Sequence, residues 1–219
     1  MWAVVPVKEM RQAKQRLTPE MSADERRRFV EAMLSDVLEA LLRVDGLEGV
    51  LVVTRDSEAS LAAREQGAAV LEESDDRGLN GALEEAAAHL DREGADGLLI
   101  VPGDVPALCA DEVAAVVKTH KGSSPALSIV SDRHGRGTNC LACSPPNLIR
   151  FRFGIDSFTA HQEEARAVGV VPSLPELPSL CLDVDTPEDL ARLSPLSVGE
   201  RTLEFLDSRK LRIAVGSGG

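Results

Sequence analysis

Long apolar runs are missing from this sequence of 219 residues. A membrane-spanning helix needs roughly 18 to 20 consecutive apolar residues, and no segment approaches that length. The amino terminus also lacks the basic start and apolar core that are typical of a secretory signal, because Lys8 comes only after the first apolar run. We therefore expect a cytoplasmic protein with no membrane partner.

Cysteine is also scarce, with four residues in the chain, at positions 109, 140, 143 and 181. This number is too small for a disulfide scaffold in a domain of this size, so reduced thiols are expected. Cys140 and Cys143 form a C-x-x-C motif, which zinc sites and redox sites both use. Since no second cysteine or histidine pair completes a zinc site, and the motif lies in a strand-like stretch, we expect buried thiols without a metal or redox role.

Positive charge is the third scarcity, because 24 Lys and Arg residues oppose 36 Asp and Glu residues and leave a formal net charge of -12. Such a charge repels phosphate backbones, so we expect no nucleic-acid partner. A local exception lies near the amino terminus, where Lys8, Arg11, Lys14 and Arg16 are opposed only by Glu9. An anionic small molecule would be attracted to this basic cluster.

Apolar residues alternate between strand and helix patterns along the chain, which predicts an α/β fold with a mostly parallel sheet and an inserted antiparallel portion. The hydrophobic fraction of 43% is enough for one core, so we expect a domain over 1–194 and a partly flexible extension over 195–219. The expected strands are 2–7, 50–54, 68–71, 98–101, 126–131 and 139–143. The expected helices are 22–44, 57–66, 79–90, 111–119, 158–168 and 200–206, and a strand-helix unit covers 180–193.

In open α/β sheets, ligands bind at the carboxyl ends of strands, which directs attention to the loop after the first strand. This loop lacks the glycines of a Walker motif or of a dinucleotide-binding turn. Cationic side chains would therefore have to hold phosphate, and Lys8, Lys14 and Arg16 are the candidates. The alternative is a basic loop that is merely solvated.

Two carboxylate sites follow apolar segments. Asp104 comes directly after the segment 98–101 and a Pro-Gly turn, where it could hold a divalent cation or simply form the turn. Asp183 and Asp185 alternate with apolar residues, so on a strand they would share one face about 7 Å apart. A metal ion would relieve their repulsion, whereas capping of the helix that starts near Thr186 would leave Asp183 unexplained.

Two segments are rich in groups that bind anions. Residues 134–139 include Thr138 and several glycines, and residues 153–158 place Gly154 and Ser157 at the start of a predicted helix. A hairpin turn and ordinary helix capping are the respective alternatives. His161, one turn into the helix, is expected at the surface.

Six motifs, taken in order, resemble the guanylyltransferases that make the phospho-acid donor for the deazaflavin coenzyme. They are PVK…AKQRL, GLNGAL, VPGDVPAL, GRGTN, RFGIDSFTAH and LDVDTPEDL, and they extend from Val4 to about Leu193. Members of this family are 2-phospho-L-lactate, phosphoenolpyruvate or 3-phosphoglycerate guanylyltransferases. The resemblance implies a three-layer fold of the nucleotide-diphospho-sugar transferase type, like that of the molybdenum-cofactor guanylyltransferases.

The resemblance also implies transfer of GMP from GTP to a phosphorylated three-carbon acid, with release of pyrophosphate. It assigns Mg²⁺ as the cofactor, with the ligands Asp104, Asp183 and Asp185. It assigns the nucleotide to Lys8, Lys14, Arg16, Leu79, Asn80 and Asp104, with catalytic roles for Lys8 and Lys14. It assigns the acceptor to Thr138, Gly154 and Ser157.

Two other functions remain open from the sequence. A sugar or molybdopterin nucleotidyltransferase would share the metal site and differ in the acceptor loops. A noncatalytic regulator would keep the nucleotide site without turnover. A homodimer, and a transient contact with the transferase that receives the product, are both compatible with the resemblance.

Overall fold

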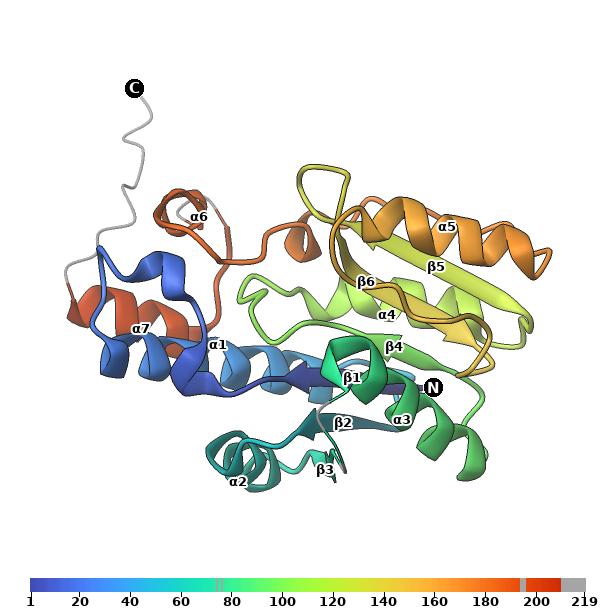
Figure 1. The fold of residues 1–219 in the computed structure, drawn as a ribbon, viewed down its shortest axis with the longest axis horizontal. Coiled ribbons are helices and arrows are strands. Elements are labelled where there is room, and N and C mark those ends of the chain that lie inside the picture. The colour runs from blue at the N-terminus through green and yellow to red at the C-terminus, as the bar shows by residue number, and fades with distance from the viewer. Residues whose placement is uncertain (74, 76, 194–195, 210–219) are drawn as a thin grey trace.

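The computed structural model describes residues 1–73, 75, 77–193 and 196–209, and these form one six-stranded sheet with helices on both faces (Figure 1). The strand order is β3-β2-β1-β4-β6-β5. The strands are β1 (Trp2–Val7), β2 (Gly49–Thr54), β3 (Ala69–Glu72), β4 (Leu98–Ile100), β5 (Ala126–Ser131) and β6 (Thr138–Ser144).

Parallel pairing joins the first four strands, and β6 then runs antiparallel to both β4 and β5. The first four strands are parallel because a helix or long connection returns the chain to the same end of the sheet each time. The predicted mixed sheet is therefore confirmed, and the carboxyl ends of β1, β2 and β4 meet at one edge, where a ligand is expected.

Seven α-helices and three short 3-10 helices are described. The α-helices are α1 (Ala23–Leu42), α2 (Ser57–Glu65), α3 (Gly78–Arg92), α4 (Ala110–His120), α5 (Ser157–Ala167), α6 (Pro187–Arg192) and α7 (Glu200–Ser208). The 3-10 helices are η1 (Met10–Gln12), η2 (Gln15–Leu17) and η3 (Pro178–Leu180). No α-helix in the described part of the chain is long and apolar enough to cross a membrane.

Two hydrophobic clusters, one on each face of the sheet, make the fold three-layered. One cluster joins the sheet to α1, α2, α4 and α7, and the other joins it to α3 and α5. Helix α1 starts at a capping box, in which Ser22 and Glu25 bond each other's backbone N–H groups. Its Phe29 packs against Phe205 of α7, with ring centroids 5.3 Å apart, and Figure 1 shows the two helices side by side.

The strand expected within residues 180–185 is wrong. The chain there forms η3 and then an irregular segment, although Leu180, Leu182 and Val184 are buried as the alternation predicts. The backbone of this segment bonds loops and not a strand: the carbonyl of Cys181 accepts from the N–H of Arg133, and the N–H of Val184 donates to the carbonyl of Asp104. The 7 Å spacing expected for Asp183 and Asp185 on a strand therefore does not apply.

Candidate active site

A cavity of about 990 Å³ opens at the carboxyl ends of β1, β2 and β4. Its walls come from the loop after β1, the start of α3, the turn after β4 and the segment before α6. Functional side chains in its lining are Lys8, Lys14, Arg55, Leu79, Asp104 and Asp185. The structure thus brings together groups that are up to 177 positions apart in the chain, from Lys8 to Asp185.

Lys14 lies between two carboxylates in the wall of this cavity. Its Nζ donates to Oδ2 of Asp104 and, at 2.6 Å, to Oδ1 of Asp185. The side chain is only 7% exposed, and its backbone adopts a left-handed conformation with a φ of 55° between η1 and η2. Burial disfavours the charged ammonium, but the two carboxylates outweigh burial and hold the pKa of Lys14 above its usual value. Lys14 is therefore a fixed positive charge at this site.

The two aspartate segments are held together by backbone as well as side-chain bonds. The N–H of Val184 donates to the carbonyl of Asp104 at 3.1 Å. The N–H of Asp185 donates to Asp189 at 3.1 Å, and Asp189 also forms a capping box with Thr186 at the start of α6. Helix capping therefore positions Asp185 beside the cavity.

Asp183 faces a different environment from Asp185. Its Oδ1 accepts from Nδ2 of Asn139 at 3.2 Å. Burial, together with the charges of Asp104 and Asp185, raises the pKa of Asp183, and the bond from Asn139 acts in the opposite direction. The region therefore holds more negative charge than Lys14 alone neutralises.

The carboxylates can accommodate Mg²⁺ if the substrate supplies further ligands. Within the described residues, no group of three or more His, Cys, Asp or Glu side chains is arranged to hold a metal by itself. Mg²⁺, however, is commonly bound by one or two carboxylates together with waters and substrate phosphates. Oδ1 of Asp104 is buried and has no hydrogen-bond partner in the described structure, so it has a lone pair to offer a cation. Asp104 and Asp185 therefore fit a magnesium ion that is shared with a nucleotide.

Two of the predicted nucleotide residues lie apart from the cavity lining. Arg16 is exposed on η2. Asn80, in the first turn of α3, uses its side-chain amide to bond the backbone of Phe153: Oδ1 accepts from N–H at 2.8 Å, and Nδ2 donates to the carbonyl at 3.0 Å. Asn80 thus connects the helix that borders the cavity to the predicted acceptor segment.

The predicted acceptor residues occupy two adjoining segments. Thr138 begins β6 and is buried, next to an irregularity in the β5–β6 register that is typical of a β-bulge. Gly154, with a φ of 134°, precedes Ser157, the buried first residue of α5. The N–H of Phe158 donates to the carbonyl of Arg136 at 2.9 Å, which ties the two segments together.

The expectation that His161 lies at the surface is wrong, because its side chain is fully buried. Ser157, His161 and Ala165 recur at intervals of four on the buried face of α5. The same spacing is visible in the sequence and could have placed His161 inside. Its Nδ1 lies 3.0 Å from Oγ1 of Thr138, so the buried imidazole contacts a predicted acceptor residue.

Comparison with known proteins identifies the family. The family model described as "Guanylyl transferase CofC like" matches residues 1–218. The chain belongs to this family. The predicted resemblance is therefore confirmed.

Curated relatives of this guanylyl transferase cover almost the whole chain. A phosphoenolpyruvate guanylyltransferase of Conexibacter woesei is 38% identical over 200 residues, which cover 91% of this chain and 90% of that protein. A 2-phospho-L-lactate guanylyltransferase of Methanothermobacter thermautotrophicus is 37% identical over 213 residues, which cover 97% and 92%.

Solved structures agree with the predicted fold. A putative nucleotide-diphospho-sugar transferase from Desulfovibrio desulfuricans matches with a TM-score of 0.72 and 17% identity, over 97% of this chain and 96% of that one. CMP:2-keto-3-deoxy-manno-octonic acid synthetase in complex with CTP matches with a TM-score of 0.62 and 14% identity, over 94% and 98%. The nucleotide-diphospho-sugar transferase-like fold is confirmed.

One cavity residue of this guanylyl transferase was missed by the sequence analysis. Arg55 follows β2 directly and lines the cavity from the strand next to β1. Its position after a buried strand was the available signal, because the carboxyl ends of parallel strands meet at one edge.

The C-x-x-C pair behaves as expected. Cys140 and Cys143 lie in β6 and are buried, and burial raises the pKa of both thiols to about 12. Thiols that remain protonated at neutral pH are poor nucleophiles and poor metal ligands. The prediction of buried thiols is confirmed.

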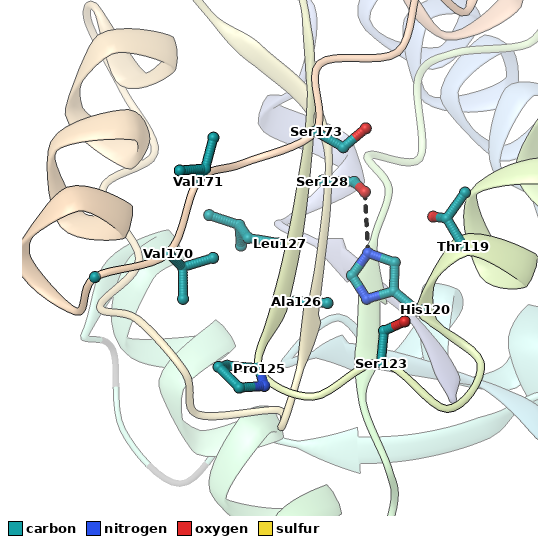
Figure 2. Close-up of a pocket in the computed structure, with 11 residues that line it drawn as sticks. Thr119, His120, Ser123, Pro125, Ala126, Leu127, Ser128, Val170, Val171 and Ser173 are labelled. Carbon is teal, nitrogen blue, oxygen red and sulfur yellow. Dashed lines mark hydrogen bonds between the residues drawn. The ribbon is translucent and has the colours of Figure 1, made fainter.

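A second, smaller cavity of about 370 Å³ lies at the opposite end of the sheet (Figure 2). It borders Ala126, the first residue of β5. Ala126 pairs with Ser144 of β6, which lies next to the amino end of β4. His120 in its wall is buried, with Nε2 3.0 Å from Oγ of Ser128 and Nδ1 3.1 Å from Oγ of Ser144. Since both ring nitrogens have hydroxyl partners, this histidine serves packing between α4 and the sheet.

Proposed function

We propose that this chain transfers GMP from GTP to a phosphorylated three-carbon acid and releases pyrophosphate, as a step in deazaflavin coenzyme biosynthesis. The observation that carries the proposal is the Lys14 ammonium held between Asp104 and Asp185 in a cavity of a guanylyl transferase family member. A fixed cation beside carboxylates that fit Mg²⁺ is suited to a triphosphate.

The proposed reaction is attack by an acceptor phosphate oxygen on the α-phosphorus of GTP. A bond from this oxygen to the α-phosphorus forms, and the bond from the α-phosphorus to the bridging oxygen of the β-phosphate breaks. Because the acceptor phosphate is already ionised at neutral pH, no general base is needed. Both reactants are anionic, so their mutual repulsion is the main obstacle.

The cationic side chains of the cavity reduce that repulsion. Lys14 is buried and fixed. Lys8 is exposed at the cavity, where its side chain can move to contact the phosphates. Magnesium bound by Asp104 and Asp185 would neutralise charge at the attacked phosphorus and on the leaving pyrophosphate. Asp183, bonded to Asn139, would complete the carboxylate set from the acceptor side.

The acceptor is assigned to the adjoining segments that contain Thr138, Gly154 and Ser157. Ser157 lies at the amino terminus of α5, where the helix dipole favours an anion. Two hydroxyls, one glycine and a helix terminus suit a small carboxylate or phosphate better than a bulky sugar or pterin.

The choice among acceptors is a matter for measurement. Relatives named for phosphoenolpyruvate and for 2-phospho-L-lactate are 38% and 37% identical to this chain, so identity does not separate them. Phosphoenolpyruvate, 2-phospho-L-lactate and 3-phospho-D-glycerate are all proposed substrates. Cytoplasmic location, a homodimer and a transient contact with the downstream transferase remain predictions.

The test is pyrophosphate release from GTP and Mg²⁺ with each of the three acids. We expect turnover with at least one acid, its loss without Mg²⁺, and its loss in Asp104→Asn, which removes a charge at the cavity. Turnover only with a sugar phosphate or a molybdopterin would favour that class of nucleotidyltransferase. GTP binding without any pyrophosphate release would favour a regulator.

A further inference from the structure

The buried imidazole of His161 bonds both acceptor segments. Nε2 accepts from the backbone N–H of Arg152 at 2.9 Å, and Nδ1 lies 3.0 Å from Oγ1 of Thr138. The ring of Phe153 packs edge to face against the imidazole, with centroids 4.8 Å apart. These contacts hold the imidazole of His161 in one orientation.

The bond from Arg152 decides which nitrogen of the imidazole carries the proton. A backbone N–H can only donate, so Nε2 must be unprotonated. Burial, with a smaller effect of the charge on Arg152, lowers the pKa of His161 to about 4, so the ring is neutral at pH 7. A neutral ring that lacks a proton on Nε2 carries it on Nδ1, and this proton is donated to Thr138.

The bond from His161 in turn limits the hydroxyl of Thr138. The hydroxyl has one proton, and because its oxygen accepts from His161, that proton must point elsewhere. Within the described ranges, no other protein group accepts it in a hydrogen bond. The next residue of β6, Asn139, bonds Asp183, so the strand that carries Thr138 also contacts the carboxylate segment.

We propose that His161 is a positioning residue, which fixes the Thr138 hydroxyl as a hydrogen-bond donor to an anionic oxygen of the phospho-acid. The inference rests on the proposed function, because it needs Thr138 to contact the acceptor. A hydroxyl that is already oriented loses less freedom when the acceptor binds. His161 itself touches no substrate and transfers no proton.

Two substitutions separate this role from a purely structural one, because each keeps one of the two bonds. In His161→Asn, the side-chain amide can occupy the position of Nδ1 and still donate to Thr138, while the bond to Arg152 is lost. In His161→Gln, the longer side chain can place its carbonyl near Nε2 and still accept from Arg152, while the bond to Thr138 is lost.

Steady-state kinetics of pyrophosphate release would measure the KM of each substrate for both variants. We expect His161→Gln to raise the acceptor KM about tenfold or more, with the KM for GTP within about twofold, and His161→Asn to stay within about threefold. If His161 only held the backbone of Arg152, His161→Asn would raise the acceptor KM more than His161→Gln. Either the reversed order or equal effects would overturn the inference.

The protonation state of His161 can be measured on the unsubstituted protein, so this test does not depend on whether a variant folds. In ¹⁵N NMR spectra at pH 7, His161 should show a protonated Nδ1 and an unprotonated Nε2. The opposite tautomer, or a protonated ring, would overturn the inference.

Thr138→Val should raise the acceptor KM as His161→Gln does. The double variant should raise the acceptor KM little further, because both substitutions act through one hydroxyl.

The outcomes also separate this inference from the proposed function. If the unsubstituted protein releases no pyrophosphate with any of the three acids, the proposed function fails, and the inference fails with it. If the unsubstituted protein is active and His161→Gln leaves the acceptor KM unchanged, only the inference fails.

Discussion

At the residue scale, Lys14 carries the electrostatics of the site. Its ammonium is buried, bonded to two carboxylates and held on a left-handed backbone, a conformation that costs a residue with a side chain about 1 kcal/mol or more. Such strain is retained where the surrounding structure requires one geometry. The exact location of the Lys14 charge therefore matters more for function than the contribution of Lys14 to stability.

Removal of this charge should affect catalysis strongly. In Lys14→Met, a side chain of similar length leaves Asp104 and Asp185 without their shared cation. We expect kcat/KM for GTP to fall about 100-fold or more, as for other fixed groups that stabilise developing charge. The measurement is steady-state pyrophosphate release. Arg16→Met removes the same charge from the exposed η2 outside the cavity, and equal losses in both variants would contradict a specific role for Lys14.

Arg55 should contribute to nucleotide binding. Arg55 lines the cavity at the end of β2, and a guanidinium can donate to a phosphate or to a base oxygen. We expect Arg55→Ala to raise the KM for GTP about tenfold, with kcat changed much less. The matched control is Arg64→Ala on α2, whose exposed guanidinium bonds Glu72 outside the cavity lining. An unchanged KM in Arg55→Ala would exclude this contact.

At the element scale, α1 and α7 depend on each other. The amino terminus of α7 has no side-chain cap of its own, and Asp36 of α1 supplies it by accepting from the N–H groups of Arg201 at 3.1 Å and Thr202 at 2.8 Å. Phe29 and Phe205 then close the contact between the helices. The carboxylate of Asp36, 165 positions from Arg201, thus caps α7 in place of a local side chain.

Removal of this distant cap should destabilise the fold. Asp36 is buried, so Asp36→Ala leaves two backbone N–H groups without a partner, and we expect a loss of about 1–3 kcal/mol in the free energy of unfolding. Urea denaturation followed by circular dichroism measures this value. Glu39→Ala, one turn further along α1, removes an exposed ion pair with the same Arg201 and should change stability by at most about 0.5 kcal/mol.

At the scale of the whole molecule, two buried histidines join helices to the antiparallel part of the sheet. His120 connects α4 to β5 and β6, and His161 connects α5 to β6. Burial lowers the pKa of both side chains, His161 to about 4 from a usual value of 6.5. Both histidines are therefore neutral in the folded protein at pH values where the unfolded chain binds protons.

Stability should consequently fall in mild acid. Because the unfolded state binds more protons between pH 6.5 and 4, the contribution of His161 is complete above pH 6.5 and is lost as the pH falls towards 4. The loss is up to about 3 kcal/mol for this residue. Urea denaturation across this range should show a steeper pH dependence for the unsubstituted protein than for His161→Gln. His134→Gln, at an exposed histidine, should leave the slope unchanged.

Local sequence patterns predicted most of the secondary structure and several residues that line the cavity. Apolar periodicity located the expected elements with small shifts at their ends, apart from the strand near 180–185, and the motif set identified the family that the comparison confirms. Lys8, Lys14, Leu79, Asp104 and Asp185 do line one cavity. Each lies after a strand or near the start of a helix at the carboxyl edge of the sheet, and this edge can be deduced from the order of the elements.

Tertiary structure alone decided how those residues are connected. Residues 180–185 bond the loops after β4 and β5 and not a strand, which the alternation of apolar residues could not reveal. Asn80 bonds Phe153, His161 bonds Thr138, and Asp36 caps α7 across 73, 23 and 165 or 166 positions, respectively. The sequence determined which residues are apolar, charged or able to cap, because these are local properties. The long-range contacts were decided by packing, because they depend on which elements become neighbours in space.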